Sequence, residues 1–274
     1  MEIWEAVWKS VILGTVQGLT EFLPVSSSGH LVFLQKLLGY DLAGGSMMFV
    51  NIMLHFGTLL AVCVVFRKDI FALFHKPFKT LFMLVVATIP AGVVGLLLND
   101  KIDAVFAGDK SLLYLAVCFA TTALVLLVCE FVAKQRKRHN PLGWKSSIPM
   151  GLAQAIAVLP GISRSGSTIA AGTICGAKTD DVAKFSFLMS VPIILGSVAV
   201  SLKGVIFDEP ESLAGFGAAG IIGVVVGVVC AAVSGFFAIK VMLKIIGKAN
   251  YKWFSLYLVL LSLTCFWLNV LGMY

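Results

Sequence analysis

The sequence is poor in charged residues and has no closely spaced pair of cysteines. Only 13% of its 274 residues are charged, whereas 59% are hydrophobic, and its mean hydropathy is +0.99. About a quarter of the residues of a soluble domain are charged, so this composition predicts an integral membrane protein. The six cysteines include no C-x-x-C pair, the spacing of many zinc and dithiol sites. We expect them to be reduced packing residues.

The N-terminus also lacks the features of a cleaved signal peptide. Acidic residues and a lysine lie inside its first apolar stretch, and no small-residue cleavage site follows. We therefore expect the segment to be retained.

The net charge of +7 could indicate a nucleic-acid partner. The basic residues, however, gather in short runs between apolar stretches, as the positive-inside rule for membrane proteins requires, so we expect no nucleic acid.

Six apolar stretches are long enough to cross a bilayer, which takes about 20 residues. They are residues 47–66, 80–98, 112–132, 182–202, 215–239 and 253–272. Two further apolar regions, 3–38 and 148–175, are interrupted near the middle by Pro, Gly and Ser residues. Irregular backbone at membrane depth is tolerated only where protein buries it or water reaches it. We therefore predict an all-α integral membrane protein with six transmembrane helices and two re-entrant helical hairpins.

The two interrupted regions resemble each other at a separation of half the chain. Gln17 and Gln154 are 137 residues apart, as are Ser26 and Ser163, Ser28 and Ser165, and Gly29 and Gly166. Each half is predicted to form one hairpin followed by three spans. Because three is odd, the second half starts from the opposite face of the membrane, and its topology is inverted. The sequence predicts one membrane domain, 1–274, with inverted repeat halves of about 1–137 and 138–274. Broken helices at matching places indicate a binding site near the midplane.

The distribution of charge between the loops predicts the orientation. Basic residues dominate loops 67–79, 133–147 and 240–252, which share one face with loop 176–184, while the loops on the other face carry Asp100, Asp103, Asp109, Asp208, Glu209 and Glu211. The basic face is expected to be cytoplasmic. Both termini would then lie outside, and the two hairpins would enter from opposite faces and meet.

Two charged residues near the breaks, Glu21 and Arg164, indicate function, because charge at membrane depth is costly. Hydroxyls, an arginine and two new helix N-termini together favour an anion, most plausibly phosphate. A carboxylate beside phosphate would repel it unless a divalent cation lies between them, and Mg²⁺ takes such ligands. His30 is placed to serve as the base for a serine nucleophile.

Structural roles are the alternatives for several of these residues. Ser28, Ser165 and Ser167 could simply bond a neighbouring helix, His30 could be a packing histidine, and Arg164 could have a purely structural role. Asn51, His55 and Thr58 share one face of the first span; they could line the cavity, although bonding between helices is the favoured reading. A stripe of small residues is expected to pack inside the chain, and consists of Gly223, Gly227 and Ala231.

Two motifs make the chain resemble the undecaprenyl-diphosphate phosphatases of the bacitracin-resistance type. The first signature of that family, Glu or Gln followed four residues later by Glu, is matched by Gln17 and Glu21 and continues in Pro24-Val25-Ser26-Ser27-Ser28-Gly29-His30. The second, Pro-Gly-x-Ser-Arg-Ser-x-x-Thr, is matched in full by residues 160–168. Length, the order of spans and the repeat agree with it.

The resemblance implies a phosphatase of the bacterial cytoplasmic (inner) membrane that hydrolyses undecaprenyl diphosphate and uses a divalent cation, Mg²⁺ or Ca²⁺. It assigns catalysis to Glu21, Ser26, Ser27, His30 and Arg164. It assigns substrate binding to Gln17, Ser28, Ser163, Arg164, Ser165 and Thr168, and metal binding to Glu21 and Gln17. Some members have Glu where Gln17 stands, which puts a two-carboxylate metal site in doubt. The cleft is expected to open to the outer face, and the oligomeric state is left open.

Two other classes compete with this reading. An anion or lipid-diphosphate transporter, or a flippase, also uses inverted repeats and broken helices, but it has no need of the carboxylate, serines and histidine on one hairpin. The acid phosphatase superfamily shares Pro-Ser-Gly-His and Ser-Arg elements. Its second histidine, a few residues after Ser-Arg, is missing from 165–170. Three nucleophiles are possible: Ser26, Ser27 and a metal-bound water. The position of Ser27 in the middle of the break favours it.

Overall fold

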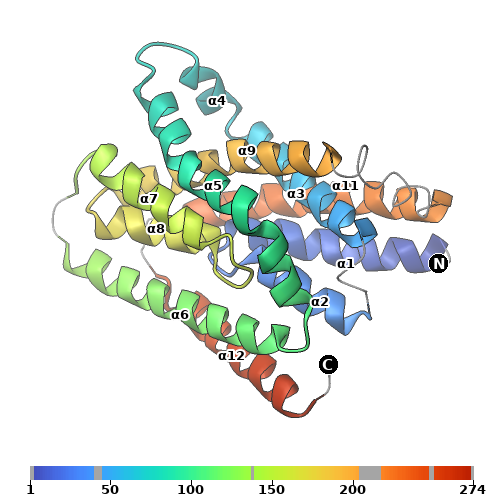
Figure 1. Cartoon of the computed structure of the whole chain (residues 1–274). Coiled ribbons are helices and arrows are strands. Elements are labelled where there is room, and N and C mark those ends of the chain that lie inside the picture. The colour runs from blue at the N-terminus through green and yellow to red at the C-terminus, as the bar shows by residue number, and fades with distance from the viewer. Residues whose placement is uncertain (1–2, 40–44, 137–138, 204–216, 247–249, 273–274) are drawn as a thin grey trace.

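The computed structural model describes residues 3–39, 45–136, 139–203, 217–246 and 250–272, and every regular element within them is a helix (Figure 1). The helices are α1 (Ile3–Phe22), α2 (Ser27–Leu37), α3 (Gly45–Val65), α4 (Arg67–Leu73), α5 (Lys79–Ala107), α6 (Ser111–Gln135), α7 (Trp144–Ile156), α8 (Arg164–Ile174), α9 (Thr179–Lys203), α11 (Gly217–Ile246) and α12 (Lys252–Val270). The predicted all-helical class is confirmed.

Five of the described helices are long and apolar enough to cross a membrane, and the bent pair α3–α4 brings the number to six. The axis turns by 82° between α3 and α4. These candidates overlap all six predicted spans. The number of spanning segments expected from hydropathy is therefore compatible with the structure, which describes a multi-pass membrane protein of five to six spans.

Several loops predicted from charge turn out to be helical. The helix α5 continues to Ala107, so Asp100 and Asp103 lie in it, and α11 continues to Ile246 with Lys240 and Lys244 on its last turns. The reason is local: no Gly or Pro interrupts 96–107 or 236–246, and Lys and Leu propagate a helix well. Part of the orientation argument lies outside the described residues, namely Lys137, Arg138, Asp208, Glu209, Glu211 and Lys248.

Helices that correspond at the 137-residue separation make corresponding contacts. An offset of 137 carries Ser27–Leu37 onto Arg164–Ile174, the bounds of α2 and α8. The helix α1 packs along α11, and α7 packs in the same way along α5, while α3 pairs with α9 and α6 with α12 (Figure 1). The α1–α11 contact is close because its residues are small. A Cβ atom on Gly14 would lie 2.3 Å from the carbonyl oxygen of Gly227.

The predicted small-residue stripe on α11 is confirmed as a packing surface. A Cβ atom on Gly223 would lie 3.0 Å from the Oγ of Ser10, and Ala231 is fully buried.

The cysteines fit their prediction, as packing residues, only in part. Cys129 and Cys265 are buried, but Cys63 and Cys175 are exposed at the surface.

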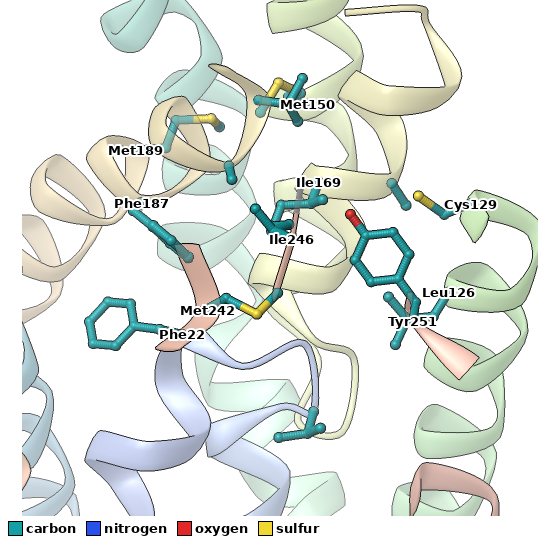
Figure 2. Packing of buried hydrophobic residues seen from close by; sticks show 14 of the residues in the cluster. Phe22, Leu126, Cys129, Met150, Ile169, Phe187, Met189, Met242, Ile246 and Tyr251 are labelled. Carbon is teal, nitrogen blue, oxygen red and sulfur yellow. The ribbon is translucent and has the colours of Figure 1, made fainter. Parts of the chain in front are cut away.

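The largest apolar cluster extends along the bundle, from Phe106 and Leu112 at the junction of α5 and α6, past Phe22 and Val25 at the first break, to Ile246 at the end of α11. Figure 2 shows Phe22, from the end of α1, beside Met242 of α11, with Ile169 of α8 above Met242 and Tyr251 to its right. The ring of Phe22 meets that of Phe187 edge-on, with centroids 5.6 Å apart. Buried apolar side chains exclude water, so this cluster surrounds the first break with a dry interior.

Candidate active site

The two breaks in the helices are turns closed by serine caps. Helix α1 ends at Phe22 and α2 begins at Ser27, where the Oγ of Ser26 accepts the N–H of Gly29 at 3.4 Å. Helix α8 begins in the same way, with the Oγ of Ser163 accepting the N–H of Gly166 at 3.1 Å. Serine is a favoured N-cap because its oxygen satisfies a free N–H of the first turn. The same residue type therefore starts both helices after the breaks.

The backbone of Ser26 lies in an unusual conformation. Its φ is 68°, and within the described residues it is the one residue other than glycine with positive φ. Positive φ is uncommon for residues with a side chain, and such strain is maintained only where surrounding contacts impose it. In the second break Ser163, the counterpart of Ser26, has a φ of −71°, and the positive φ of 93° lies at Gly161. The strained serine is thus a feature of the first turn.

The turns are bonded directly to each other. The Oγ of Ser26 accepts the backbone N–H of Gly161 at 3.1 Å, and the Oγ of Ser165 donates to the carbonyl of Leu23 at 3.0 Å. The backbones approach so closely that a Cβ atom on Gly29 would lie 2.8 Å from the Cα of Gly161. Residues from the two interrupted regions, predicted to meet, form one site.

Glu21, the charged centre of this site, is buried, with an exposed fraction of 7%. Its Oε1 lies 2.5 Å from a guanidinium nitrogen of Arg164. Its Oε2 accepts the hydroxyl of Ser27 at 2.5 Å and the amide of Gln17 at 2.9 Å, and lies 3.7 Å from the Nε2 of His55. Both oxygens of the carboxylate are therefore occupied, and the serine hydroxyl has a strong acceptor.

Arg164 is held in place from two sides. Besides the ion pair with Glu21, its second terminal nitrogen donates to the backbone carbonyl of Ser186 on α9 at 3.2 Å. The Oγ1 of Thr168 lies 2.8 Å from the carbonyl of Arg164 and 2.6 Å from the Oγ of Ser186. The planar guanidinium uses a fork of donors to join helices α1, α8 and α9, a geometry that lysine cannot reproduce.

His30 was predicted to be the base for Ser27, but it contacts other groups. Its Nδ1 lies 2.7 Å from the backbone carbonyl of Ser26, and its Nε2 lies 2.6 Å from the hydroxyl of Tyr257 on α12. Within the described residues the hydroxyl of Ser27 has Glu21, not His30, as its hydrogen-bond acceptor. This geometry makes Glu21 the stronger candidate for the base.

The remaining predicted binding residues lie around the turns. The Oγ of Ser28 is 3.4 Å from that of Ser26, and the Oγ of Ser163 is 3.3 Å from that of Ser165. These hydroxyls, like that of Thr168, are engaged in the local structure, and for Ser28 and Ser165 a structural role is the alternative to substrate binding. Their assignment to substrate remains a prediction.

Four polar residues at the site were not assigned to it by the motifs. His55 approaches Glu21, Ser186 supports Arg164, Tyr257 bonds His30, and the Oγ1 of Thr122 accepts the N–H of Ser163 at 3.1 Å and donates to the carbonyl of Gly161 at 3.0 Å. Each is a polar residue in a mainly apolar helix. That signal is present in the sequence, but it does not reveal the direction in which the side chain points. Of the four, only His55 was considered above as a cavity residue.

The residues around Glu21 fit a divalent cation only together with a phosphorylated substrate. Within the described part of the chain, no three His, Cys, Asp or Glu side chains are grouped as metal ligands would be. The Oε1 of Gln17 is buried and without a partner among the same residues, which makes it a second oxygen beside Glu21. Mg²⁺ commonly binds one or two carboxylates and takes its other ligands from water and substrate phosphate, so this donor set suffices for a cation that shares its coordination with the substrate.

Together, the fold and the site define a multi-pass helical membrane protein in which two interrupted helices build one buried polar centre around the ion pair of Glu21 and Arg164. A family model described as bacitracin resistance protein BacA matches residues 10–264, and the chain belongs to that family. A curated relative from Carboxydothermus hydrogenoformans is 39% identical over 97% of this chain and 98% of its own. Relatives from Halothermothrix orenii and Methanobrevibacter smithii are 36% and 37% identical, over 92% and 91% of this chain and 93% and 92% of theirs. All three are named undecaprenyl-diphosphatase.

Proposed function

We propose that the protein is an undecaprenyl-diphosphatase, which hydrolyses undecaprenyl diphosphate to undecaprenyl phosphate and inorganic phosphate and so recycles the lipid carrier of cell-wall synthesis. Membership of the family and the shared name of the relatives support this function. The observation that carries it is the contact of Ser27 and Arg164 with the two oxygens of Glu21. A nucleophile, a base and a cation are thereby combined at one buried point.

The site suits a diphosphate on a lipid tail. Arg164 offers a cation, and α2 and α8 both begin at the breaks, where the first N–H groups of a helix attract anions. Apolar side chains on the surrounding helices are extensively exposed, among them Leu19 on α1. A polar head and an apolar tail can therefore both be accommodated at the edge of the bundle.

In the mechanism that we favour, the Oγ of Ser27 attacks the terminal phosphorus while its proton passes to the Oε2 of Glu21. The bond between the terminal phosphorus and the bridging oxygen breaks, and undecaprenyl phosphate leaves. Water then attacks the phosphoserine, releases inorganic phosphate and regenerates the hydroxyl. Arg164 stabilises the charge that develops on the phosphate oxygens. The alternative is direct attack by water, with Ser27 only donating a hydrogen bond.

The covalent route predicts a transient phosphoserine. After rapid acid quenching with labelled substrate, we expect mass spectrometry to find phosphate on Ser27, appearing and decaying at rates compatible with turnover. With a chiral terminal phosphorus, two in-line displacements should retain the configuration. Inversion, or phosphate on Ser26 instead, would contradict the assignment of Ser27.

The divalent cation is part of the proposal. Glu21 and Gln17 would hold it, and when bound it supplies positive charge to the diphosphate. We expect chelation to abolish phosphate release by the purified protein, and Mg²⁺ or Ca²⁺ to restore it. The Gln17→Glu variant should need less added cation, because a carboxylate binds it more strongly than an amide does. Full activity in excess chelator would remove the cation from the proposal.

We further propose that the chain has six spans and two re-entrant hairpins in an inverted repeat, in the cytoplasmic (inner) membrane with both termini outside. The matching bounds of α2 and α8 and the paired contacts of α1 with α11 and of α7 with α5 support the repeat. The role of the lipid carrier, which is released after transfer outside the cell, supports a cleft that opens to the outer face.

Release of phosphate in detergent tests the function. The purified protein should release phosphate from undecaprenyl diphosphate, which a transporter or flippase would not do, because transport requires a membrane with two sides. A protein without hydrolytic activity in detergent and in vesicles would contradict the proposal.

A further inference from the structure

Tyr257 of α12 joins the candidate site through His30. Its hydroxyl lies 2.6 Å from the Nε2 of His30, and the two rings are stacked with an interplanar angle of 10° and centroids 5.6 Å apart. The edge of Phe119 on α6 confines the imidazole from another side. His30 is 6% exposed, whereas Tyr257 is 44% exposed. The tyrosine therefore reaches from the surface of the bundle to a buried group.

The contacts of His30 define which ring nitrogen carries the proton. A backbone carbonyl can only accept, so the Nδ1 that lies 2.7 Å from the carbonyl of Ser26 must be the donor. In the neutral imidazole the Nε2 is then an acceptor, and the hydroxyl of Tyr257 is its donor. Tyr257 thus stabilises the tautomer that bonds to Ser26.

The carbonyl that receives this bond belongs to the strained residue of the turn. Ser26 has a φ of 68°, and its carbonyl accepts both the backbone N–H of His30, at 3.2 Å, and the Nδ1–H of the same residue. Strain of this kind persists only where neighbouring contacts over-determine it. Because Ser27 follows directly, the orientation of this peptide also sets the direction of the Ser27 hydroxyl towards Glu21.

We propose that Tyr257 is a positioning residue for catalysis: through His30 it stabilises the strained turn at Ser26 and so aligns the Ser27 hydroxyl with Glu21. Tyr257 itself makes no contact with Glu21, Ser27 or Arg164 among the described hydrogen bonds, so its effect is indirect. The proposal deepens the phosphatase function and rests on it for its kinetic consequence, but the hydrogen-bonded chain can be tested without turnover.

The Tyr257→Phe variant removes only the hydroxyl and keeps the stacked ring. Loss of one neutral hydrogen bond that orients the nucleophile should lower kcat by about 2- to 10-fold. KM should change little, because the substrate is not contacted. Tyr114→Phe is the matched control: Tyr114 is 40% exposed on α6 and contacts Phe106, and we expect this variant to keep the kcat of the unmodified protein.

A double-mutant cycle separates positioning through His30 from an independent effect. His30→Phe keeps a ring between Phe119 and Tyr257 but removes both nitrogens. Because the proposed effect passes through His30, Tyr257→Phe should cause no further loss of kcat in the His30→Phe background. An equal loss of kcat in both backgrounds would overturn the proposal.

The nitrogen resonances of histidine test the contact directly. In the protein labelled with ¹⁵N-histidine, the His30 signals are identified by their absence in His30→Phe. Tyr257→Phe should shift the Nε2 resonance towards that of a nitrogen without a donor, and Tyr114→Phe should leave it unchanged. An unchanged His30 resonance in Tyr257→Phe overturns the proposal even if the protein proves inactive as a phosphatase. A shifted resonance without hydrolysis would instead place the failure in the proposed function.

Discussion

Replacing Arg164 by lysine is expected to lower the rate of phosphate release by on the order of a hundredfold or more, and replacement by alanine to abolish it. The guanidinium bonds Glu21 on one side and the carbonyl of Ser186 on the other, at 2.5 and 3.2 Å. A lysine can supply charge, but a single ammonium cannot reproduce this fork and also bind phosphate. Phosphate release in detergent measures the effect. The exposed Arg67 provides the control, since Arg67→Lys should retain full activity.

Loss of folding must be separated from loss of catalysis in Arg164→Ala. Removing one partner of a buried ion pair typically costs about 3–5 kcal/mol, because the other charge is left buried and unpaired. Combining Arg164→Ala with Glu21→Gln removes that charge. We expect the double variant to recover thermal stability without activity. If Arg164→Lys turned over substrate at the original rate, Arg164 would not be the phosphate-binding cation.

Glu21→Gln is expected to cause a comparable loss and to abolish the response to divalent cations at the same time. The carboxylate accepts the Ser27 hydroxyl at 2.5 Å, and an amide in its place is too weakly basic to take the proton. The matched control is Glu5→Gln on the same helix, where the carboxylate pairs with Lys9 at a partly exposed position. Phosphate release as a function of Mg²⁺ concentration is the measurement. A Glu21→Gln protein with normal turnover and a normal Mg²⁺ response would exclude both proposed roles.

The sequence predicted the spans and the two breaks because their signals are local. Twenty apolar residues, or a Pro-Gly-Ser interruption between two apolar arms, can be read without knowing any partner. The pairing of Glu21 with Arg164 is different, since 143 positions separate them. The repeat predicted only that the two breaks meet, and no local pattern indicated that these two side chains would form an ion pair.

The role of His30 shows why proximity in sequence misleads at a helix start. Ser27 and His30 are three residues apart, and position alone suggested that they bond. In the helix α2 the ring of His30 instead turns back to the carbonyl four residues earlier, at Ser26. The acceptor for Ser27 comes from the other side of the turn, at Glu21. Tyr257 is 227 residues from His30, and nothing in its apolar surroundings distinguishes it from a membrane-interface tyrosine.

The ion pair between Glu21 and Arg164 also bears on selectivity and on product release. In the resting site the guanidinium of Arg164 already has the carboxylate of Glu21 as a counter-ion 2.5 Å away. An incoming anion must therefore attract the guanidinium more strongly than this carboxylate does. A highly charged diphosphate, fixed by its lipid tail, competes well for the guanidinium. Free inorganic phosphate has less charge and no tail, so the returning carboxylate displaces it. If Arg164 is the phosphate-binding cation, as proposed, the resting ion pair weakens inhibition by inorganic phosphate, the product.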